Sequence, residues 1–234
     1  MPKIQIRYTV YDTETTRELC LRDLGLKSLP PELELFNKVK YLDCSFNLLR
    51  NLKHLPPNLE TLRCINNKLH DGLPDDLPQS LTDLDCNGCD LYKLPVLPPN
   101  LKILYCGNNY IDEVDHLPES LVSLYCYRNR ITKLDHLPSG LKRLSCWSNH
   151  INTLDYLPLG LKWLNCVTTD LESLDFLPVG LKYLECSTSV KTLYNLPPHL
   201  ERIKYHEECT QIGDIPPSLI HINEEDEDVG GWFD

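Results

Sequence analysis

Cysteine is the residue type whose number and spacing in this chain most suggest chemistry. Eleven cysteines occur among the 234 residues, and eight of them return in the same local frame. The eight are Cys44, Cys64, Cys86, Cys106, Cys126, Cys146, Cys166 and Cys186. From Cys86 onward, every step is 20 residues. Thiols can form disulfides, hold a metal ion or act as nucleophiles, so each of these uses has to be weighed.

A disulfide scaffold is disfavoured by the geometry that a fixed period imposes. Such a period means that similar units stack, and equivalent residues of neighbouring parallel strands then lie ~4.8 Å apart with side chains pointing the same way. A disulfide requires Cβ atoms ~3.8 Å apart that are directed at each other. We therefore predict that the eight cysteines are small, reduced, buried hydrophobes in a cytosol-like compartment.

The other chemical uses of cysteine lack their partner residues. Cys86 and Cys89 form a Cys-x-x-Cys pair, but a zinc site needs two further ligands, and none follows at finger-like spacing. Cys20 and Cys209 are candidates for accessible thiols. No nucleophile–base pair or phosphate-binding loop is recognisable in the sequence. We expect no cofactor, no metal and no enzymatic activity.

These cysteines occupy the sixth position of one repeated unit, L-x-x-L-x-C-x-x-N-x-L-x-x-L-x-x-L-P-x-x. Its apolar fourth and sixth positions alternate with variable residues at positions three, five and seven, which is the period of a strand with one buried face. The ninth-position Asn, as in Asn109 and Asn129, is predicted to bond backbone groups where the chain leaves the strand. The Leu-Pro pair favours extended or polyproline backbone, not helix, on the opposite side.

This unit resembles the leucine-rich repeat family, and the resemblance covers roughly residues 16–222. The short Leu-Pro form is most similar to the repeats of bacterial secreted effectors. The cysteine-rich form is similar to leucine-rich repeat proteins of giant DNA viruses of amoebae. The resemblance implies a β-rich solenoid with a parallel sheet on one face and extended segments on the other.

Three segments are predicted along the chain. Residues 1–15 form an N-terminal β-strand cap, residues 16–222 hold about ten repeats, and residues 223–234 form an acidic tail that we expect to be flexible. Residues 4–10 alternate apolar and polar side chains, and residues 12–15 have the composition of a turn. We expect a β-hairpin whose first strand covers the open edge of the sheet, because the end of a solenoid needs a cap.

Composition narrows the classes of partner. The net charge is −11, and residues 224–228 supply five of the negative charges. A nucleic-acid partner is disfavoured because it requires concentrated Lys and Arg. No apolar run is long enough to span a membrane, and the N-terminus has no apolar signal segment. We expect a cytoplasmic protein, in a host cell or within a virion if the chain is viral.

The variable strand positions offer the strongest candidate site. Positions three, five and seven of repeats five to nine carry six large aromatic residues and one arginine, all predicted to lie on the exposed face of the sheet. They are Tyr105, Tyr125, Tyr127, Arg143, Trp147, Trp163 and Tyr183. Equivalent N-terminal positions are polar, as in Asp43, Arg63 and Asp85. Exposed aromatic patches are typical of partner-binding surfaces, although aromatics on strands also stabilise sheets by cross-strand stacking.

Two charged rows recur at other positions of the unit. They are Asp115, Asp135, Asp155 and Asp175, and Lys142, Lys162 and Lys182. Local hydrogen bonds to backbone N–H groups would explain the aspartate row, and a cation-binding or basic-partner edge is the alternative.

The leading hypothesis is a non-enzymatic scaffold that binds a protein partner through the strand face of repeats five to nine. The resemblance adds that the partner would be a host or viral protein. Two alternatives stay open: a structural or virion-associated component without a specific partner, and a carbohydrate-binding module that uses the aromatic face.

Overall fold

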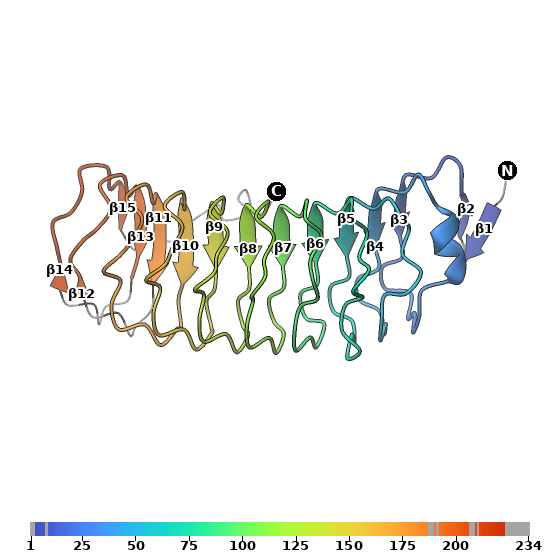
Figure 1. Ribbon diagram of the computed structural model, residues 1–234, viewed down its shortest axis with the longest axis horizontal. Helices are drawn as coiled ribbons and strands as arrows, with labels where there is room; N and C mark the ends of the chain where they lie inside the picture. The colour runs from blue at the N-terminus through green and yellow to red at the C-terminus, as the bar shows by residue number, and fades with distance from the viewer. Residues whose placement is uncertain are drawn as a thin grey trace.

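The protein, seen in a computed structural model, is an elongated solenoid in which each turn contributes one short strand (Figure 1). The structure describes residues 3–7, 9–186, 190, 192–205, 209 and 211–222, so the predicted tail, residues 223–234, lies outside the described residues. The strands of the main sheet are β3 (Glu18–Cys20), β4 (Tyr41–Asp43), β5 (Thr61–Arg63), β6 (Asp83–Asp85), β7 (Ile103–Tyr105), β8 (Ser123–Tyr125), β9 (Arg143–Ser145), β10 (Trp163–Cys166), β11 (Tyr183–Cys186), β13 (Arg202–Lys204) and β15 (His221–Ile222).

These strands form one 11-stranded parallel sheet that follows the chain order from β3 to β15. The register joins equivalent positions of the repeat, so Leu104 pairs with Leu124 and Leu124 pairs with Leu144. The predicted solenoid with a parallel sheet on one face is therefore confirmed.

The core of the solenoid consists of stacked columns of leucine and cysteine. Leu104, Leu124 and Leu144 have no exposed surface, and neither do Cys106 and Cys126, because they point inward from the same side of adjacent strands. Burying a leucine stabilises the fold by roughly 1.5–3 kcal/mol. Each turn thus supplies one layer that only its two neighbours can cover.

The ninth-position asparagines join each turn to the next. Asn129 donates from Nδ2 to the carbonyls of Cys106 (3.0 Å), Cys126 (3.0 Å) and Tyr127 (3.2 Å), and its Oδ1 accepts from the N–H of Ile111 (2.9 Å). The same pattern of bonds is made by Asn47, Asn67, Asn109 and Asn149. The predicted backbone-bonding role of this position is confirmed.

At two described positions of this column, a side chain with a single donor takes the place of the asparagine. Cys89 donates from Sγ to the carbonyl of Cys64 at 3.0 Å, and Thr169 donates from Oγ1 to the carbonyl of Cys166 at 2.8 Å. Neither side chain can supply the two donors of an amide together with its carbonyl acceptor.

The residue before the ninth position of the repeat has a left-handed backbone in seven successive turns. These residues are Phe46, Asn66, Gly88, Asn108, Arg128, Ser148 and Thr168, with φ between 49° and 65°. Glycine and asparagine tolerate this region, whereas a β-branched residue such as Thr168 is strained in it. The reversal turns the chain away from the strand just before the asparagine enters the core.

The face opposite the strands is extended chain, as predicted from the Leu-Pro pairs. One short 3-10 helix, η1 (Pro31–Leu35), is the only helical element within the described ranges. Near the C-terminal end, β12 (Thr192–Leu193) and β14 (Gln211–Ile212) form a small parallel sheet on this side.

The N-terminal hairpin is present, but the strands that it joins differ from the prediction. β1 (Lys3–Ile6) pairs antiparallel with β2 (Thr9–Asp12), so the hairpin closes between Ile6 and Thr9. The turn predicted at residues 12–15 is present, with the N–H of Thr16 bonded to the carbonyl of Asp12 at 3.0 Å, but it leads from β2 to β3. Arg7 has φ 55°, a conformation that the alternating pattern of residues 4–10 does not signal. The two strands form their own sheet and do not extend the main one.

The hairpin is attached to the first turn by side chains. Tyr11 packs edge-on against Phe36 with 6.5 Å between ring centroids, and Arg7 donates to the carbonyl of Leu24 at 2.8 Å. This covers the apolar end of the core while leaving β3 at the edge of the sheet.

Candidate functional site

The strand face of the sheet divides into two surfaces. We call β4–β6 with Asp43, Arg63, Asp83 and Asp85 the polar half. We call the surface from β7 to β11 the aromatic half, and its residues are Tyr105, Tyr125, Tyr127, Arg143, Trp147, Trp163 and Tyr183. Five of the seven sequence-predicted site residues lie in consecutive strands of the sheet, β7 to β11, and Tyr127 and Trp147 follow β8 and β9 by two residues.

The aromatic half is built from stacked pairs on adjacent turns. The rings of Tyr105 and Tyr125 lie 4.5 Å apart at 7°, and those of Tyr127 and Trp147 lie 4.9 Å apart at 3°. Trp163 and Tyr183 form a third pair at 5.4 Å and 10°. Parallel in-register strands lie ~4.8 Å apart, which is close to the separation that stacked rings prefer, so the solenoid repeat itself aligns the pairs.

A glycine on the preceding turn leaves room for the Tyr127 ring. A Cβ added to Gly107 would lie 2.6 Å from Cζ of Tyr127, so the ring rests directly on the glycine backbone. The N–H of Gly107 is held by Oδ1 of Asn87 at 2.6 Å. The position of the Tyr127–Trp147 stack thus depends on the absence of a side chain at residue 107.

Two of the pairs meet across a strand that carries a small residue. The rings of Tyr125 and Trp163 approach to 6.4 Å although β9 lies between their strands. The residue of β9 at that level is Ser145, which is 3 % exposed. A larger side chain at this position would hold the two rings apart.

This packing corrects the prediction that all seven residues are exposed. Tyr125 is only 4 % exposed, because Tyr105 and Trp163 cover it from both sides, and the other six residues are half-buried. Tyr125 therefore supports the surface, while its neighbours form it.

The hydroxyls of Tyr105, Tyr125 and Tyr127 remain protonated at neutral pH. Burial raises the pKa of Tyr105 to about 12, and the neighbouring Tyr125 adds to the shift. Burial also raises the pKa of Tyr125 and of Tyr127. These phenols can act as hydrogen-bond donors at the edge of an apolar platform.

Arginines frame the aromatic platform. The guanidinium of Arg128 lies 4.7 Å from the centre of the Trp147 ring, a cation–π contact on top of the Tyr127 stack. Arg143 is half-buried between Ser123 and Trp163 in the sheet register. Tryptophan, tyrosine and arginine together are the residue types enriched at the centres of protein interfaces.

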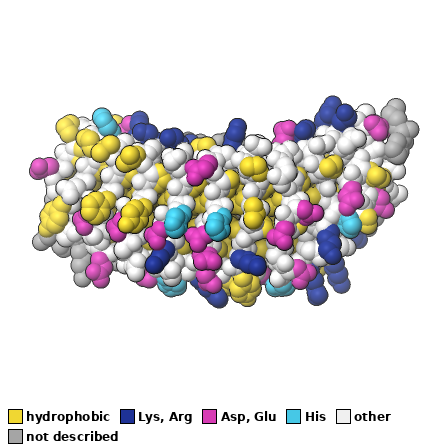
Figure 2. Space-filling model, viewed as in Figure 1, with side chains coloured by type: hydrophobic (Ala, Val, Ile, Leu, Met, Phe, Trp, Pro, Cys, Tyr) yellow, Lys and Arg dark blue, Asp and Glu magenta, His cyan; other side chains and the backbone are white. Residues whose placement is uncertain are grey.

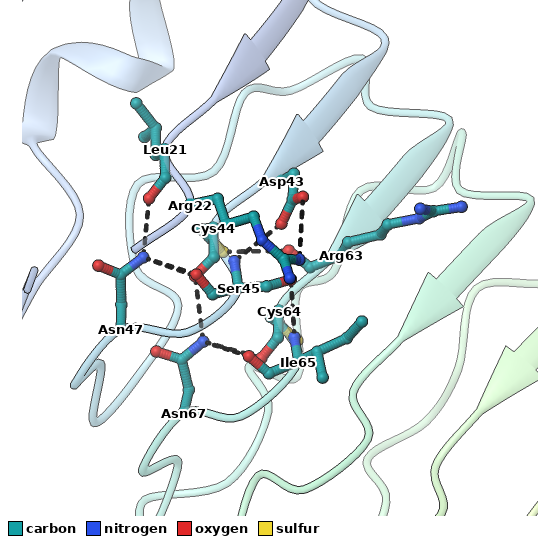
Figure 3. A network of polar contacts seen from close by, with 10 residues as sticks. All are labelled: Leu21, Arg22, Asp43, Cys44, Ser45, Asn47, Arg63, Cys64, Ile65 and Asn67. Atoms are coloured by element: carbon teal, nitrogen blue, oxygen red, sulfur yellow. Dashed lines mark hydrogen bonds and ion pairs between the residues drawn. The ribbon is translucent and has the colours of Figure 1, made fainter. Parts of the chain in front are cut away.

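In the polar half, charged side chains and hydrogen bonds take the place of the ring stacks (Figure 3). Asp43 is 7 % exposed; its Oδ1 accepts from the N–H of Ser45 at 2.9 Å, and its Oδ2 lies 3.9 Å from Nη1 of Arg22. Oγ of Ser45 accepts from the N–H of Ile65 at 3.1 Å. Next along the sheet, Arg63 stands in register between Asp43 and Asp85.

Asp85 is the most perturbed carboxyl of the polar half. Burial raises its pKa to about 6, and the bond from the N–H of Asn87 and the charge of Arg63 only partly oppose the shift. This carboxylate is therefore ionised near neutral pH at an energetic cost.

The eleven cysteines are all free thiols, and the eight in the regular frame lie in the core. Most donate to the next turn: Sγ of Cys64 bonds the carbonyl of Asp85 at 3.3 Å, and Sγ of Cys86 bonds that of Tyr105 at 3.3 Å. Burial raises the pKa of Cys126 to about 12. These thiols are structural and unreactive in the folded chain.

The remaining cysteines have different surroundings. Cys20 is exposed, as its strand position predicted, whereas Cys209 is buried and is not the accessible thiol that its irregular repeat suggested. Cys89 occupies the asparagine position beside the core column.

One surface feature was missed by the sequence reading. On the extended side of the solenoid, Tyr156, Leu159, Phe176 and Val179 project outward from two adjacent turns. Their columns within the repeat could have revealed them, because the same columns hold polar residues in the two preceding turns. A shallow depression lined by Leu154, Asp155, Ser173, Leu174, Asp175, Phe176 and Leu177 lies at the same place.

Two further kinds of feature are absent from the described parts of the chain. No cluster of three or more His, Cys, Asp or Glu residues is arranged to hold a metal ion there. Over the same ranges, no helix combines the length and the apolar character that crossing a membrane requires.

Three solved structures are similar to this chain. YopM from Yersinia enterocolitica WA-314 is 32 % identical with a TM-score of 0.69, over 85 % of this chain and 48 % of YopM. A domain of InlJ from Listeria monocytogenes, described as including a cysteine ladder, is 25 % identical with a TM-score of 0.61, over 84 % of this chain and 45 % of that one. The chain thus spans about half the length of either protein.

A chain from the octameric complex of Latrophilin 3, Unc5D and FLRT2, whose FLRT2 part is a leucine-rich repeat unit, is 18 % identical with a TM-score of 0.69. It covers 89 % of this chain and 83 % of that one, and at this identity the likeness shows the fold alone. No protein-family model matches the sequence, and a search of curated proteins gave no match.

Proposed function

We propose that this chain, a leucine-rich repeat solenoid like its solved neighbours, is a non-enzymatic scaffold that binds a protein partner through its aromatic half. The observation that carries the proposal is the cluster of half-buried Trp, Tyr and Arg side chains in one stretch of the sheet. A complete interface would cover their remaining exposed faces, which is where interface hot spots gain most of their energy.

The rigid placement of these rings supports this role. Because neighbouring rings stack, little side-chain entropy is lost when a partner binds them. The polar half beside them supplies charges that select the partner and fix its register.

The compartment and the origin of the chain form the finer part of the proposal. Eleven free thiols fit a reducing compartment, so we place the protein in the cytoplasm. The resemblance of its cysteine-rich repeats to those of giant viruses makes an amoebal host protein the partner class to test first.

The experiment is affinity capture from amoebal lysate with the full chain, compared by quantitative mass spectrometry with the Trp147→Ala/Trp163→Ala variant. The expected result is a host protein that the wild-type chain retains and the variant loses at least about tenfold, the ratio that ~1.4 kcal/mol of binding energy gives. The melting temperature of the variant is measured alongside.

The matched control is Tyr92→Ala/Tyr110→Ala, since these two rings stack at 5.3 Å outside the aromatic half. Equal recovery with both variants would refute the site. Binding on a glycan array that disappears with the tryptophan variant would replace the protein partner by a carbohydrate. Abundance in viral particles without any specific capture would favour a structural component.

A further inference from the structure

The extended side of the solenoid carries a strip of apolar side chains that are exposed to solvent and do not pack in the core. Tyr156 is 71 % exposed, Leu159 83 %, Phe176 69 % and Val179 66 %. In the two preceding turns the same columns hold His116, Glu119, His136 and Ser139. In Figure 2, hydrophobic side chains gather toward the end of the solenoid that carries β10 to β13.

The four side chains form one patch because they come from adjacent turns. Equivalent positions of neighbouring turns lie ~5 Å apart, so Tyr156 stands next to Phe176 and Leu159 next to Val179. Between the two columns lie the Leu-Pro pairs, which are themselves apolar. Contiguous exposed apolar surface of this kind marks an interaction site more often than isolated residues do.

Opposite charges border the strip on its two long sides. Asp155 directly precedes Tyr156 and Asp175 directly precedes Phe176, and both carboxylates are exposed. On the other side, Nζ of Lys162 donates to the carbonyl of Gly180 at 3.0 Å, next to Val179.

Lys142 repeats this arrangement one turn earlier. Its Nζ lies 2.5 Å from where a Cβ on Gly160 would stand, next to Leu159. The glycines of this column thus make room for the lysine heads. A carboxylate row, an apolar strip and an ammonium row run side by side along the solenoid.

We propose that this strip is an interface at which two copies of the chain associate side by side with parallel solenoid axes. The twofold axis runs along the middle of the strip, parallel to the solenoid axis. It exchanges the two charged edges of the strip and leaves the order of the turns unchanged. The carboxylate row of each copy then faces the ammonium row of the other. The aromatic column, Tyr156 and Phe176, meets the aliphatic column, Leu159 and Val179.

Charge excludes the other twofold arrangement. If the axis ran across the strip, the solenoids would be antiparallel and the carboxylate rows would face each other. Like charges placed opposite one another in an interface disfavour that arrangement strongly. The order of the three rows therefore fits a second copy and also sets its orientation.

The association is expected to be weak and reversible. Two turns supply less apolar surface than the ~800 Å² per partner of a standard stable interface. The dimer should therefore appear only with rising protein concentration, and it should weaken as salt screens the facing rows.

Sedimentation velocity of the full chain across a concentration series tests the proposal. The expected result is a monomer–dimer equilibrium. Two charge variants, Asp155→Lys/Asp175→Lys and Lys142→Glu/Lys162→Glu, each make both rows carry one sign. Each variant alone should dissociate, with a dissociation constant at least about tenfold higher than that of the wild type.

An equimolar mixture of the two variants should dimerise again, because every reversed row then faces a row of opposite sign. This recovery distinguishes a self-complementary strip from one that binds a different protein or a lipid surface. Phe176→Ser, which keeps both charged rows, should weaken the dimer as well.

Asp75→Lys/Asp76→Lys is the matched control, because it changes the charge equally at exposed residues far from the strip. It should dimerise like the wild type, and thermal unfolding verifies that all variants fold. A wild-type chain that stays monomeric throughout overturns the proposal. So do single-row variants that associate normally, and a mixture that fails to recover.

Discussion

The polar half and the aromatic half of the strand face rest on the same skeleton and carry opposite chemistry. Asn67 in the one and Asn129 in the other make the same set of backbone bonds, and the leucine columns continue through both. What changes is the variable positions. The fifth holds Asp43, Arg63 and Asp85 in the polar half and Tyr105 and Tyr125 in the aromatic half. Beyond Tyr125, the aromatic residues stand at positions seven and three, as in Trp147 and Trp163.

The spacing of the strands limits which side chains can lie next to one another, and the two halves satisfy this limit with different residues. Parallel in-register strands place like positions ~4.8 Å apart, where rings can stack but like charges repel. The aromatic half therefore uses face-to-face stacks, and the polar half alternates Asp, Arg and Asp across β4 to β6. The columns that set the fold are thus independent of the columns that set the surface.

The largest expected effect tests whether the two halves share one skeleton. Asn67→Ala and Asn129→Ala each remove buried hydrogen bonds and leave backbone groups unsatisfied. We expect the free energy of unfolding to fall by roughly 2–4 kcal/mol in both variants, measured by urea denaturation. A clear difference between the two would mean that the skeleton is not equivalent along the chain.

A second substitution acts on the aromatic half alone. Gly107→Ala places a methyl group against the Tyr127 ring, so the Tyr127–Trp147 stack must shift. We expect the free energy of unfolding to fall by about 1–3 kcal/mol and the tryptophan fluorescence to change. Gly140→Ala is the control, because its nearest neighbour would lie at an ordinary 3.5 Å. Two variants with the same effect would contradict the role assigned to Gly107.

The polar half should show its own signature in the pH dependence of stability. The pKa of Asp85 rises from 3.8 to about 6 on folding, so the folded state binds more protons between these values. Stability from this group is therefore present at low pH and is lost as pH rises from about 4 to about 6.

Asp85→Asn removes the pH-dependent loss of stability, because an amide does not titrate. Its Oδ1 can still accept the bond from the N–H of Asn87. We expect the variant to be about 1–2 kcal/mol more stable than the wild type at pH 7.5 and nearly equal to it at pH 4. Thermal unfolding at the two pH values measures the difference. A gain that is independent of pH would rule out the carboxylate as its cause.

The smallest effect concerns the turn that both halves share. Thr168 is an exposed β-branched residue at φ 52°, whereas Asn108 has φ 54° and tolerates it. We expect Thr168→Gly to raise the free energy of unfolding by roughly 0.5–1 kcal/mol, because it relieves local strain. Asn108→Gly should change it by less, and a loss of stability at position 168 would argue against strain there.

The sequence predicted the buried columns well because each is repeated many times. A leucine, cysteine or asparagine that returns every 20 residues has the same neighbours in every turn, so its burial and its bonds follow from the period alone. The parallel sheet, the extended back and the free thiols were all predicted on that basis.

Features that occur once were predicted less well. The hairpin turn between Ile6 and Thr9 depends on the left-handed conformation of Arg7, which an alternating pattern does not encode. The burial of Tyr125 depends on Trp163, which lies two strands away and reaches over Ser145 of the intervening strand. The apolar strip becomes visible only when one column is compared between turns and its exposure is known.

Stacking by nearest neighbours also gives the chain an adjustable length. Each strand of the main sheet pairs only with the strands on either side, so a whole unit could be duplicated or deleted and the flanking layers would still match. Such an event would move the charged surface relative to the aromatic one in steps of ~4.8 Å, without altering either. The number of turns between the two surfaces therefore sets the distance from one to the other.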